Sequence, residues 1–253
     1  MLLDKELTDK ELETLECKYL NKFYHFLKFV EDEMLRGFQT KEKIKNDWIN
    51  FWNSGGSSDF DVGAERIVYA LLNGKGIGQP NSCPVGADLF FEVEDAFIHI
   101  DLKTVQTRNI GDYNTSIFVG ENQNSYDYHM IVNKTEKREY TPHLPHYYTI
   151  DKHLKPCLTY FITILYEDKN LEILSINLLC MPNGQLSSIY KEDVLKAGKN
   201  PGKTRFNFHK TPNFKTLNNE KRIKVIYFND KISKSEELSK NLKFLLSIYN
   251  NEI

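Results

Sequence analysis

The chain has 253 residues, of which 40% are hydrophobic and 27% charged, so its composition is that of a soluble globular protein with one substantial domain or two small ones. The net charge of −2 argues against a strongly basic nucleic-acid binder, and no apolar run approaches the roughly 18 residues of a membrane span. The acidic start "MLLDKELTDKELE" is not that of a secretory signal peptide. The cysteines have no CxxC or zinc spacing, so we expect buried thiols in a cytosolic protein: Cys17, Cys83, Cys157 and Cys180.

The first part of the chain is predicted to be helical. Thr8 with Glu11 forms a capping box, and apolar residues then recur at spacings of three and four until Gly37. Residues 40–52 predict a second helix, and residues 62–73, closed by Gly74, predict a third.

Strands are predicted from alternating or continuous apolar runs. Five runs qualify: residues 88–93, 96–104, 157–166, 171–181 and 223–228. A last helix is predicted from Ser233, with Glu236 completing a capping box. This order predicts an α/β (α+β) fold with a central mixed, largely antiparallel sheet flanked by helices.

The charge is unevenly distributed along the chain. Residues 1–65 carry 14 acidic against 9 basic residues, a net of −5. Residues 201–224 carry seven basic residues against Glu220, a net of +6. Such segregation produces a local field that the whole-chain sum hides.

The stretch "GADLFFEVEDAFIHIDLKT", residues 86–104, contains charged residues within apolar strand sequence. If Glu94-Asp95 is the tip of a hairpin, facing residues have numbers that sum to 189, and Asp88 lies opposite Asp101. Like charges at facing positions repel, and a divalent cation between them would reverse that penalty. A loop of four residues keeps this register, whereas a loop of three or five loses it.

Two carboxylates on one hard cation, with Lys103 on the same strand face as Asp101, suit phosphodiester hydrolysis. Mg²⁺ takes oxygen ligands, keeps several waters, polarises a phosphoryl oxygen and lowers the pKa of bound water. Lys103 would orient the attacking water or stabilise charge on the phosphorus. The alternative is a surface hairpin whose charges face solvent.

"GADLFF" followed by "IHIDLKT" resembles the PD-(D/E)XK nuclease superfamily, and within it the type II restriction endonucleases. Asp88 matches the first acid of the motif, although Gly86-Ala87 replaces the usual proline, and Asp101-Leu102-Lys103 matches the D/E-x-K element. The resemblance implies a restriction-endonuclease-like fold in which Asp88, Asp101 and the Leu102 carbonyl bind Mg²⁺ and Lys103 serves the attacking water.

Glu65 is a fourth candidate for the active site. It shares a face of the 62–73 helix with apolar residues. This placement resembles the additional helical acid of many such nucleases. The alternative is a salt bridge at the rim of the core.

DNA contacts are predicted in two segments. Residues 104–128 are rich in amide and guanidinium side chains suited to base edges. The candidates are Gln106, Arg108, Asn109, Asn122, Gln123 and Asn124. Residues 201–224 are basic and aromatic and suited to phosphates, with Lys203, Arg205, Lys210 and Lys215 as candidates. The alternative for both segments is ordinary polar loop.

We therefore predict a Mg²⁺-dependent, sequence-specific endonuclease acting on double-stranded DNA in a prokaryotic cytoplasm, with no organic cofactor. One active site per chain favours a homodimer on a palindromic site. Residues 1–253 are expected to form one nuclease domain, with a helical part (1–60), a catalytic core (61–181) and a basic DNA-contacting part (182–253). The alternatives are a structure-specific repair, junction or phage nuclease of this fold, or a catalytically silent DNA-binding protein.

Overall fold

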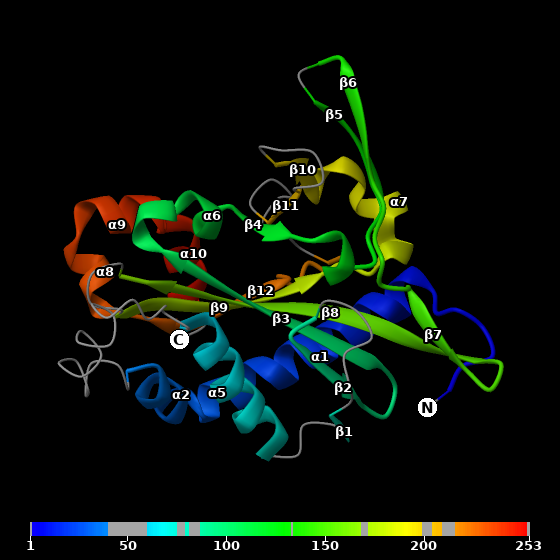
Figure 1. Cartoon of the computed structure of the whole chain (residues 1–253), viewed down its shortest axis with the longest axis horizontal. Coiled ribbons are helices and arrows are strands. Elements are labelled where there is room, and N and C mark those ends of the chain that lie inside the picture. The colour runs from blue at the N-terminus through cyan, green and yellow to red at the C-terminus, as the bar shows by residue number, and fades with distance from the viewer. Residues whose placement is uncertain are drawn as a thin grey trace, which may run out of the picture.

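The computed structural model describes residues 2–39, 60–74, 79–80, 87–132, 134–167, 172–198, 204–208 and 216–251. A central sheet, with strand order β1-β2-β3-β8-β9-β12 and β7 beside β8, runs through the molecule (Figure 1). Its strands are β1 (Gln79–Pro80), β2 (Leu89–Glu92), β3 (Phe97–Gln106), β7 (Tyr147–Ile150), β8 (His153–Tyr166), β9 (Ile173–Met181) and β12 (Ile223–Phe228).

The sheet is mixed and largely antiparallel, as the sequence predicts. Among the described strands, β3 and β8 form its one parallel pair, with Phe97 opposite Cys157 at one end and Gln106 opposite Tyr166 at the other. Strands β8 and β9 are buried almost throughout. A strand covered on both faces needs apolar side chains on both, and this explains their continuous hydrophobic sequences.

Helices α1 (Asp9–Phe29), α2 (Glu31–Phe38) and α5 (Phe60–Gly74) cover one face of the sheet (Figure 1). The predicted Thr8–Glu11 capping box is present at the start of α1. The run does not continue unbroken to Gly37, because α1 ends before Val30 and Gly37 lies inside α2. The helix expected at 40–52 lies outside the described residues.

The opposite face carries a second, smaller layer (Figure 1). A three-stranded sheet there has the order β10-β11-β4, built from Leu195–Ala197, Thr204–Asn207 and Ser116–Val119. Helices α6 (Gly111–Asn114) and α7 (Ser187–Tyr190) belong to the same layer. Strand β4 comes from the first predicted DNA segment and β11 from the second, so the fold joins the two.

A hairpin of β5 (Tyr128–Val132) and β6 (Glu136–Tyr140) projects from this layer (Figure 1). The side chain of Ile131 near its tip is 75% exposed. The sequence does not predict these strands, because their polar and charged residues weaken the apolar alternation.

The chain closes with α8 (Asp230–Lys234), α9 (Glu236–Asn241) and α10 (Lys243–Tyr249). The predicted cap at Ser233 is wrong: the Ser235 side chain accepts from Leu238 N at 3.3 Å and starts α9, since the chain turns at Ser235. No described helix is both long and apolar enough to cross a membrane. Cys17, Cys157 and Cys180 are buried thiols, as expected, and Cys83 lies outside the described residues.

Arg222 is buried, so the basic stretch exposes one positive charge fewer than its sequence contains. Its side chain is 1% exposed, and Nη2 lies 3.0 Å from Glu13 Oε1 and 2.5 Å from Glu16 Oε2, both on α1. Its Nε donates to the Tyr190 hydroxyl at 3.1 Å. Arg222 therefore ties the start of β12 to α1 and α7 and is not available to a phosphate.

Candidate active site

The β2–β3 hairpin has the register that the sequence predicts. Leu89 faces Ile100 and Glu92 faces Phe97, and Val93 N donates to Ala96 O at 3.0 Å, so the turn is Glu94-Asp95. Glu-Asp is a poor two-residue turn. The Asp95 carboxylate accepts hydrogen bonds from Lys18 and Tyr19 of α1, which hold the turn in place.

This register brings position 88 opposite position 101. Asp88 is exposed just before β2, and its Oδ2 accepts a hydrogen bond from Leu102 N at 2.7 Å. The N–H and C=O of one strand residue point to the same side. The Leu102 carbonyl therefore points to the side of β3 on which Asp88 lies.

Asp101 is a buried carboxylate with few protein partners. Its residue is 1% exposed, and neither carboxylate oxygen has a hydrogen bond within the described residues apart from the ion pair between Oδ1 and the Lys103 ammonium. Burial raises the pKa of Asp101 to about 7; Lys103 opposes this rise, and the charges of Asp88 and Glu65 add to it. Ionised Asp101 is thus costly in the protein alone, and a cation would stabilise it.

Lys103 is held by aromatic rings as well as by Asp101. Its side chain is 18% exposed, and Nζ lies 5.8 Å from the ring centre of Phe118 on β4 and 6.0 Å from that of Phe161 on β8. A lysine confined in this way presents its ammonium at a defined position.

Glu65 is half-buried on α5. Its charge contributes to the raised pKa of Asp101, so the fold brings it into the electrostatic neighbourhood of Asp88 and Asp101. The alternative for Glu65 is a salt bridge at the rim of the core, and its electrostatic effect on Asp101 favours the active-site interpretation.

The donor set suits a hard cation. No three or more His, Cys, Asp or Glu side chains form a metal-binding group within the described ranges. Asp88, Asp101 and the Leu102 carbonyl supply oxygen alone, and Mg²⁺ typically takes one or two carboxylates and keeps several waters. The oxygens of Asp101 without hydrogen bonds are the observation that fits this ion best.

The predicted base-contacting residues separate into two groups. Arg108 and Asn109 lie in a 3-10 turn (Thr107–Asn109) directly after β3, and both are exposed, as is Asn122; Gln106 is half-buried at the end of β3. The half-buried Gln123 accepts from Gly120 N at 2.7 Å through its side-chain oxygen.

The structure opposes a DNA contact for Asn124. This residue is fully buried; its Nδ2 donates to the Tyr140 hydroxyl at 2.7 Å and its Oδ1 accepts from Tyr126 N at 2.7 Å. The amide therefore fixes the chain between β4 and β5. The composition of the segment predicts a base contact because the sequence does not distinguish an exposed Asn that contacts a base from a buried Asn that holds a loop by hydrogen bonds.

Arg205 is the one candidate phosphate contact of 201–224 within the described residues, since Lys203, Lys210 and Lys215 lie outside them. It faces Phe118 across β4 and β11, with its guanidinium 5.8 Å from the Phe118 ring centre, and pairs with Asp112 Oδ1 at 3.1 Å. Phe118 thus contacts both Arg205 and Lys103. Sequence reasoning missed Phe118 and Asp112, because nothing in the local pattern marks them.

Comparison with family models identifies the chain. Residues 8–170 match the N-terminal domain of the type II restriction enzyme MwoI, and residues 173–228 match its central domain. The chain belongs to this family of type II restriction enzymes. Its activity is therefore that of a type II site-specific deoxyribonuclease, a sequence-specific DNA endonuclease.

Two solved structures share the fold. The restriction endonuclease BglI, bound to its DNA recognition sequence, matches with a TM-score of 0.67 at 15% identity over 85% of this chain and 90% of its own. Tetrameric SfiI, bound to cognate DNA, matches with a TM-score of 0.68 at 16% identity over 91% and 89%. No curated protein sequence matches the chain. The matches to BglI and SfiI confirm the restriction-endonuclease-like fold.

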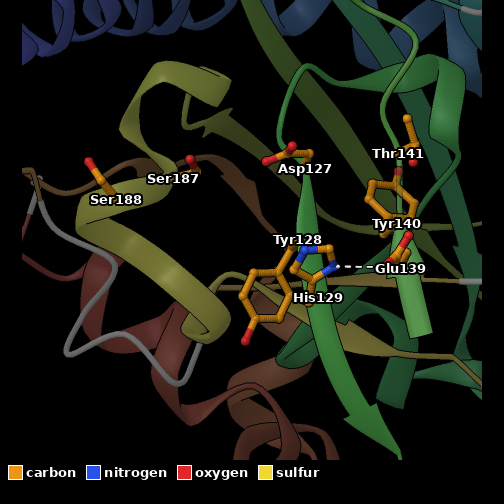
Figure 2. Close-up of a pocket in the computed structure, with 8 residues that line it drawn as sticks. All are labelled: Asp127, Tyr128, His129, Glu139, Tyr140, Thr141, Ser187 and Ser188. Carbon is orange, nitrogen blue, oxygen red and sulfur yellow. Dashed lines mark ion pairs between the residues drawn. The ribbon is translucent and has the colours of Figure 1, made fainter. Parts of the chain in front are cut away.

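A recess at the base of the β5–β6 hairpin is distinct from the candidate catalytic residues. Figure 2 shows it between the hairpin and α7, and it encloses about 420 Å³. It is lined by Asp127, Tyr128, His129, Glu139, Tyr140, Thr141, Ser187 and Ser188. His129 Nδ1 lies 3.7 Å from Glu139 Oε1, and the two carboxylates disfavour a phosphate here.

Proposed function

We propose that this restriction enzyme hydrolyses double-stranded DNA with Mg²⁺ held by Asp88, Asp101 and the Leu102 carbonyl. The observation that carries the proposal is Asp101, a buried carboxylate that faces Asp88 and whose one ion-pair partner among the described residues is Lys103. When bound, the cation polarises the phosphoryl oxygen and lowers the pKa of a coordinated water.

The remaining chemistry belongs to the protein's own side chains. The Leu102 amide orients Asp88 through its hydrogen bond. Lys103, fixed by Asp101, Phe118 and Phe161, donates a hydrogen bond that orients the attacking water. Glu65 adds a third carboxylate whose negative charge strengthens the attraction for a cation.

We assign base-edge contacts to Gln106, Arg108, Asn109 and Asn122, with Gln123 available through its side-chain amide nitrogen. The 3-10 turn with Arg108 and Asn109 directly follows the strand that carries Asp101 and Lys103, so base contact and cleavage are linked through one rigid element. Arg205, beside Lys103 through Phe118, suits a backbone phosphate, and Lys203, Lys210 and Lys215 are proposed to act with it.

We further propose one nuclease domain that works as a homodimer in a prokaryotic cytoplasm. One sheet unites the two matched regions, because β3 and β8 come from residues 8–170 and β9 and β12 from residues 173–228. One active site per chain requires a second copy to cut both strands at a two-fold site.

The metal site is tested by Mg²⁺-dependent thermal unfolding. Mg²⁺ should raise the Tm of the parent by mass action, and Asp88→Ala and Asp101→Asn should abolish this shift. Lys155→Ala is the matched control, since it removes a partner of Glu92 on the same hairpin without touching the proposed ligands. An equal Mg²⁺ shift in all four proteins would refute the assigned ligands.

A cleavage assay distinguishes a sequence-specific nuclease from a structure-specific nuclease and from a catalytically silent DNA-binding protein. Long duplex DNA should give discrete bands with Mg²⁺ and none with EDTA. Discrete bands without any divalent ion would refute the proposed metal dependence.

A further inference from the structure

A recess between α6 and the C-terminal helices is lined mostly by side chains that can donate hydrogen bonds, with no carboxylate among its described lining residues. It encloses about 350 Å³ and is formed by Asn114, Thr115, Lys240, Asn241, Lys243, Phe244 and Ser247. Among the described residues, neither Lys240 nor Lys243 has an ion-pair partner, and both are exposed. Two ammonium groups with amides and hydroxyls, without a competing acid, are suited to a phosphate.

The recess is built on fixed elements. Asn114 Nδ2 donates to Asn241 O at 3.1 Å and joins α6 to α9. Phe244 stacks on Phe208 with ring centres 6.4 Å apart, and Leu245 on the next position of α10 is fully buried. The lysine side chains therefore extend from a backbone that is held on both sides.

The recess lies on the same side of the central sheet as Lys103. Lys103 points to Phe118 on β4, and α6 directly precedes β4 in the same layer (Figure 1). Asp112 of α6, the acid nearest to Asn114 along the chain, is ion-paired with Arg205. Lys103, Arg205 and the two lysines of the recess thus follow one path across β4 and α6.

The length of this path gives a position on the DNA. Lys103 Nζ is 5.8 Å from the Phe118 ring centre. Thr115 comes three residues earlier than Phe118, or about 10 Å along extended chain. Steps of this size place the recess within a few base pairs of Lys103 on a bound duplex, because successive base pairs lie roughly 3.4 Å apart.

We propose that this recess binds a backbone phosphate of the DNA substrate within a few base pairs of the scissile phosphate. Lys240 and Lys243 neutralise the phosphate, and Asn114 and Thr115 supply hydrogen bonds. The contact carries no sequence information; it fixes the position of the duplex relative to Lys103.

The test is a DNA-binding measurement in Ca²⁺ that combines protein variants with modified duplexes. It measures affinity and not cleavage, so its outcome does not depend on the assigned catalytic residues. Lys240→Ala/Lys243→Ala should weaken binding of cognate and non-cognate duplex alike, by roughly 10-fold, and reduce the slope of log affinity against log salt by about one. Lys5→Ala/Lys10→Ala, an equal charge change on exposed lysines outside the recess, should leave both unchanged.

A series of duplexes, each with one neutral methylphosphonate, locates the phosphate. The parent should lose roughly 10-fold in affinity at one position within a few base pairs of the cut, and the Lys240/Lys243 double variant should lose nothing more there.

Three results would overturn the proposal. The first is an unchanged salt slope in the double variant, and the second is an equal methylphosphonate effect in variant and parent at every position. The third is an increase in parent Tm with inorganic phosphate that the double variant lacks, together with unchanged DNA binding; the recess would then serve a free anion.

Discussion

The protein buries charged side chains in two places, and the two differ in how fully the protein satisfies them. Around Arg222, Glu13 and Glu16 meet the guanidinium, and their remaining oxygens accept from Leu217 N at 2.7 Å and Asn183 N at 2.8 Å. Around Asp101, the protein offers the Lys103 ion pair and no hydrogen bond within the described residues, while Asp88 and Glu65 add negative charge.

Burial alone therefore does not distinguish a functional charge from a structural one. A buried ion pair that is completed within the chain holds elements together, and removing one partner leaves the other uncompensated. A buried carboxylate that the chain leaves incomplete stabilises the fold poorly and is available to an external cation. Each prediction below tests this contrast, beginning with the largest effect.

Cleavage should depend on the incomplete cluster far more than folding does. Asp101→Asn and Lys103→Ala should each reduce the cleavage rate by roughly 10⁴-fold, about 5.5 kcal/mol in the barrier. The free energy of unfolding of Asp101→Asn in metal-free buffer should equal or exceed that of the parent, because an isosteric amide removes the buried charge. Single-turnover kinetics and urea unfolding measure the two quantities, and an Asp101→Asn variant that unfolds would instead make this residue a structural ion-pair partner.

The completed cluster should show the reverse behaviour. Arg222→Met should lower the free energy of unfolding by roughly 3–5 kcal/mol, because two buried carboxylates lose their partner. Arg205→Met removes an ion pair with the more exposed Asp112 and should cost less than about 1 kcal/mol. Urea unfolding measures the free energy of unfolding of both variants. Equal losses would show that the buried Arg222 cluster stabilises the fold no more than the more exposed Arg205–Asp112 pair.

The pH dependence of stability should expose the incomplete cluster directly. Burial raises the pKa of Asp101 to about 7, above the value near 3.8 of the unfolded chain, so the folded state holds a proton between these values. This bound proton adds to the free energy of unfolding. The added stability is complete below pH 4 and is lost as the pH rises to 7, by roughly 2–4 kcal/mol. Urea unfolding without metal should show this loss in the parent and less of it in Asp101→Asn. Parallel curves for the two proteins would show that Asp101 does not titrate in this range.

The smallest effects concern base contact. Asn109→Ala and Arg108→Ala should each cost roughly 1–3 kcal/mol on the cognate site and little on other DNA. Asn124→Ala should instead lower stability and leave the cognate-to-noncognate ratio unchanged, because its amide holds the chain between β4 and β5. Competition binding in Ca²⁺ measures the ratio of cognate to non-cognate affinity. A changed ratio for Asn124→Ala would indicate that Asn124 contacts a base.

The sequence predicts the β2–β3 hairpin well because its determinants are local. Alternation places Asp88 opposite Asp101, and the short Glu94-Asp95 connection sets the register. The β4–β11 pair could not be predicted, since Phe118 and Arg205 are far apart in the chain and each strand is too short to show a period. The burial of Arg222 was equally hidden, because its partners Glu13 and Glu16 lie at the other end of the chain.

The parallel pairing of β3 with β8 also bears on the order of folding. The β2–β3 hairpin closes over two residues, whereas β8 can join β3 only after residues 107–152 have been looped out. Closure entropy makes the second step the slower one, since local contacts form before distant ones. We therefore expect Asp88 and Asp101 to meet early on a nascent hairpin, and the layer that contains β10, β11 and β4 to assemble around them afterwards.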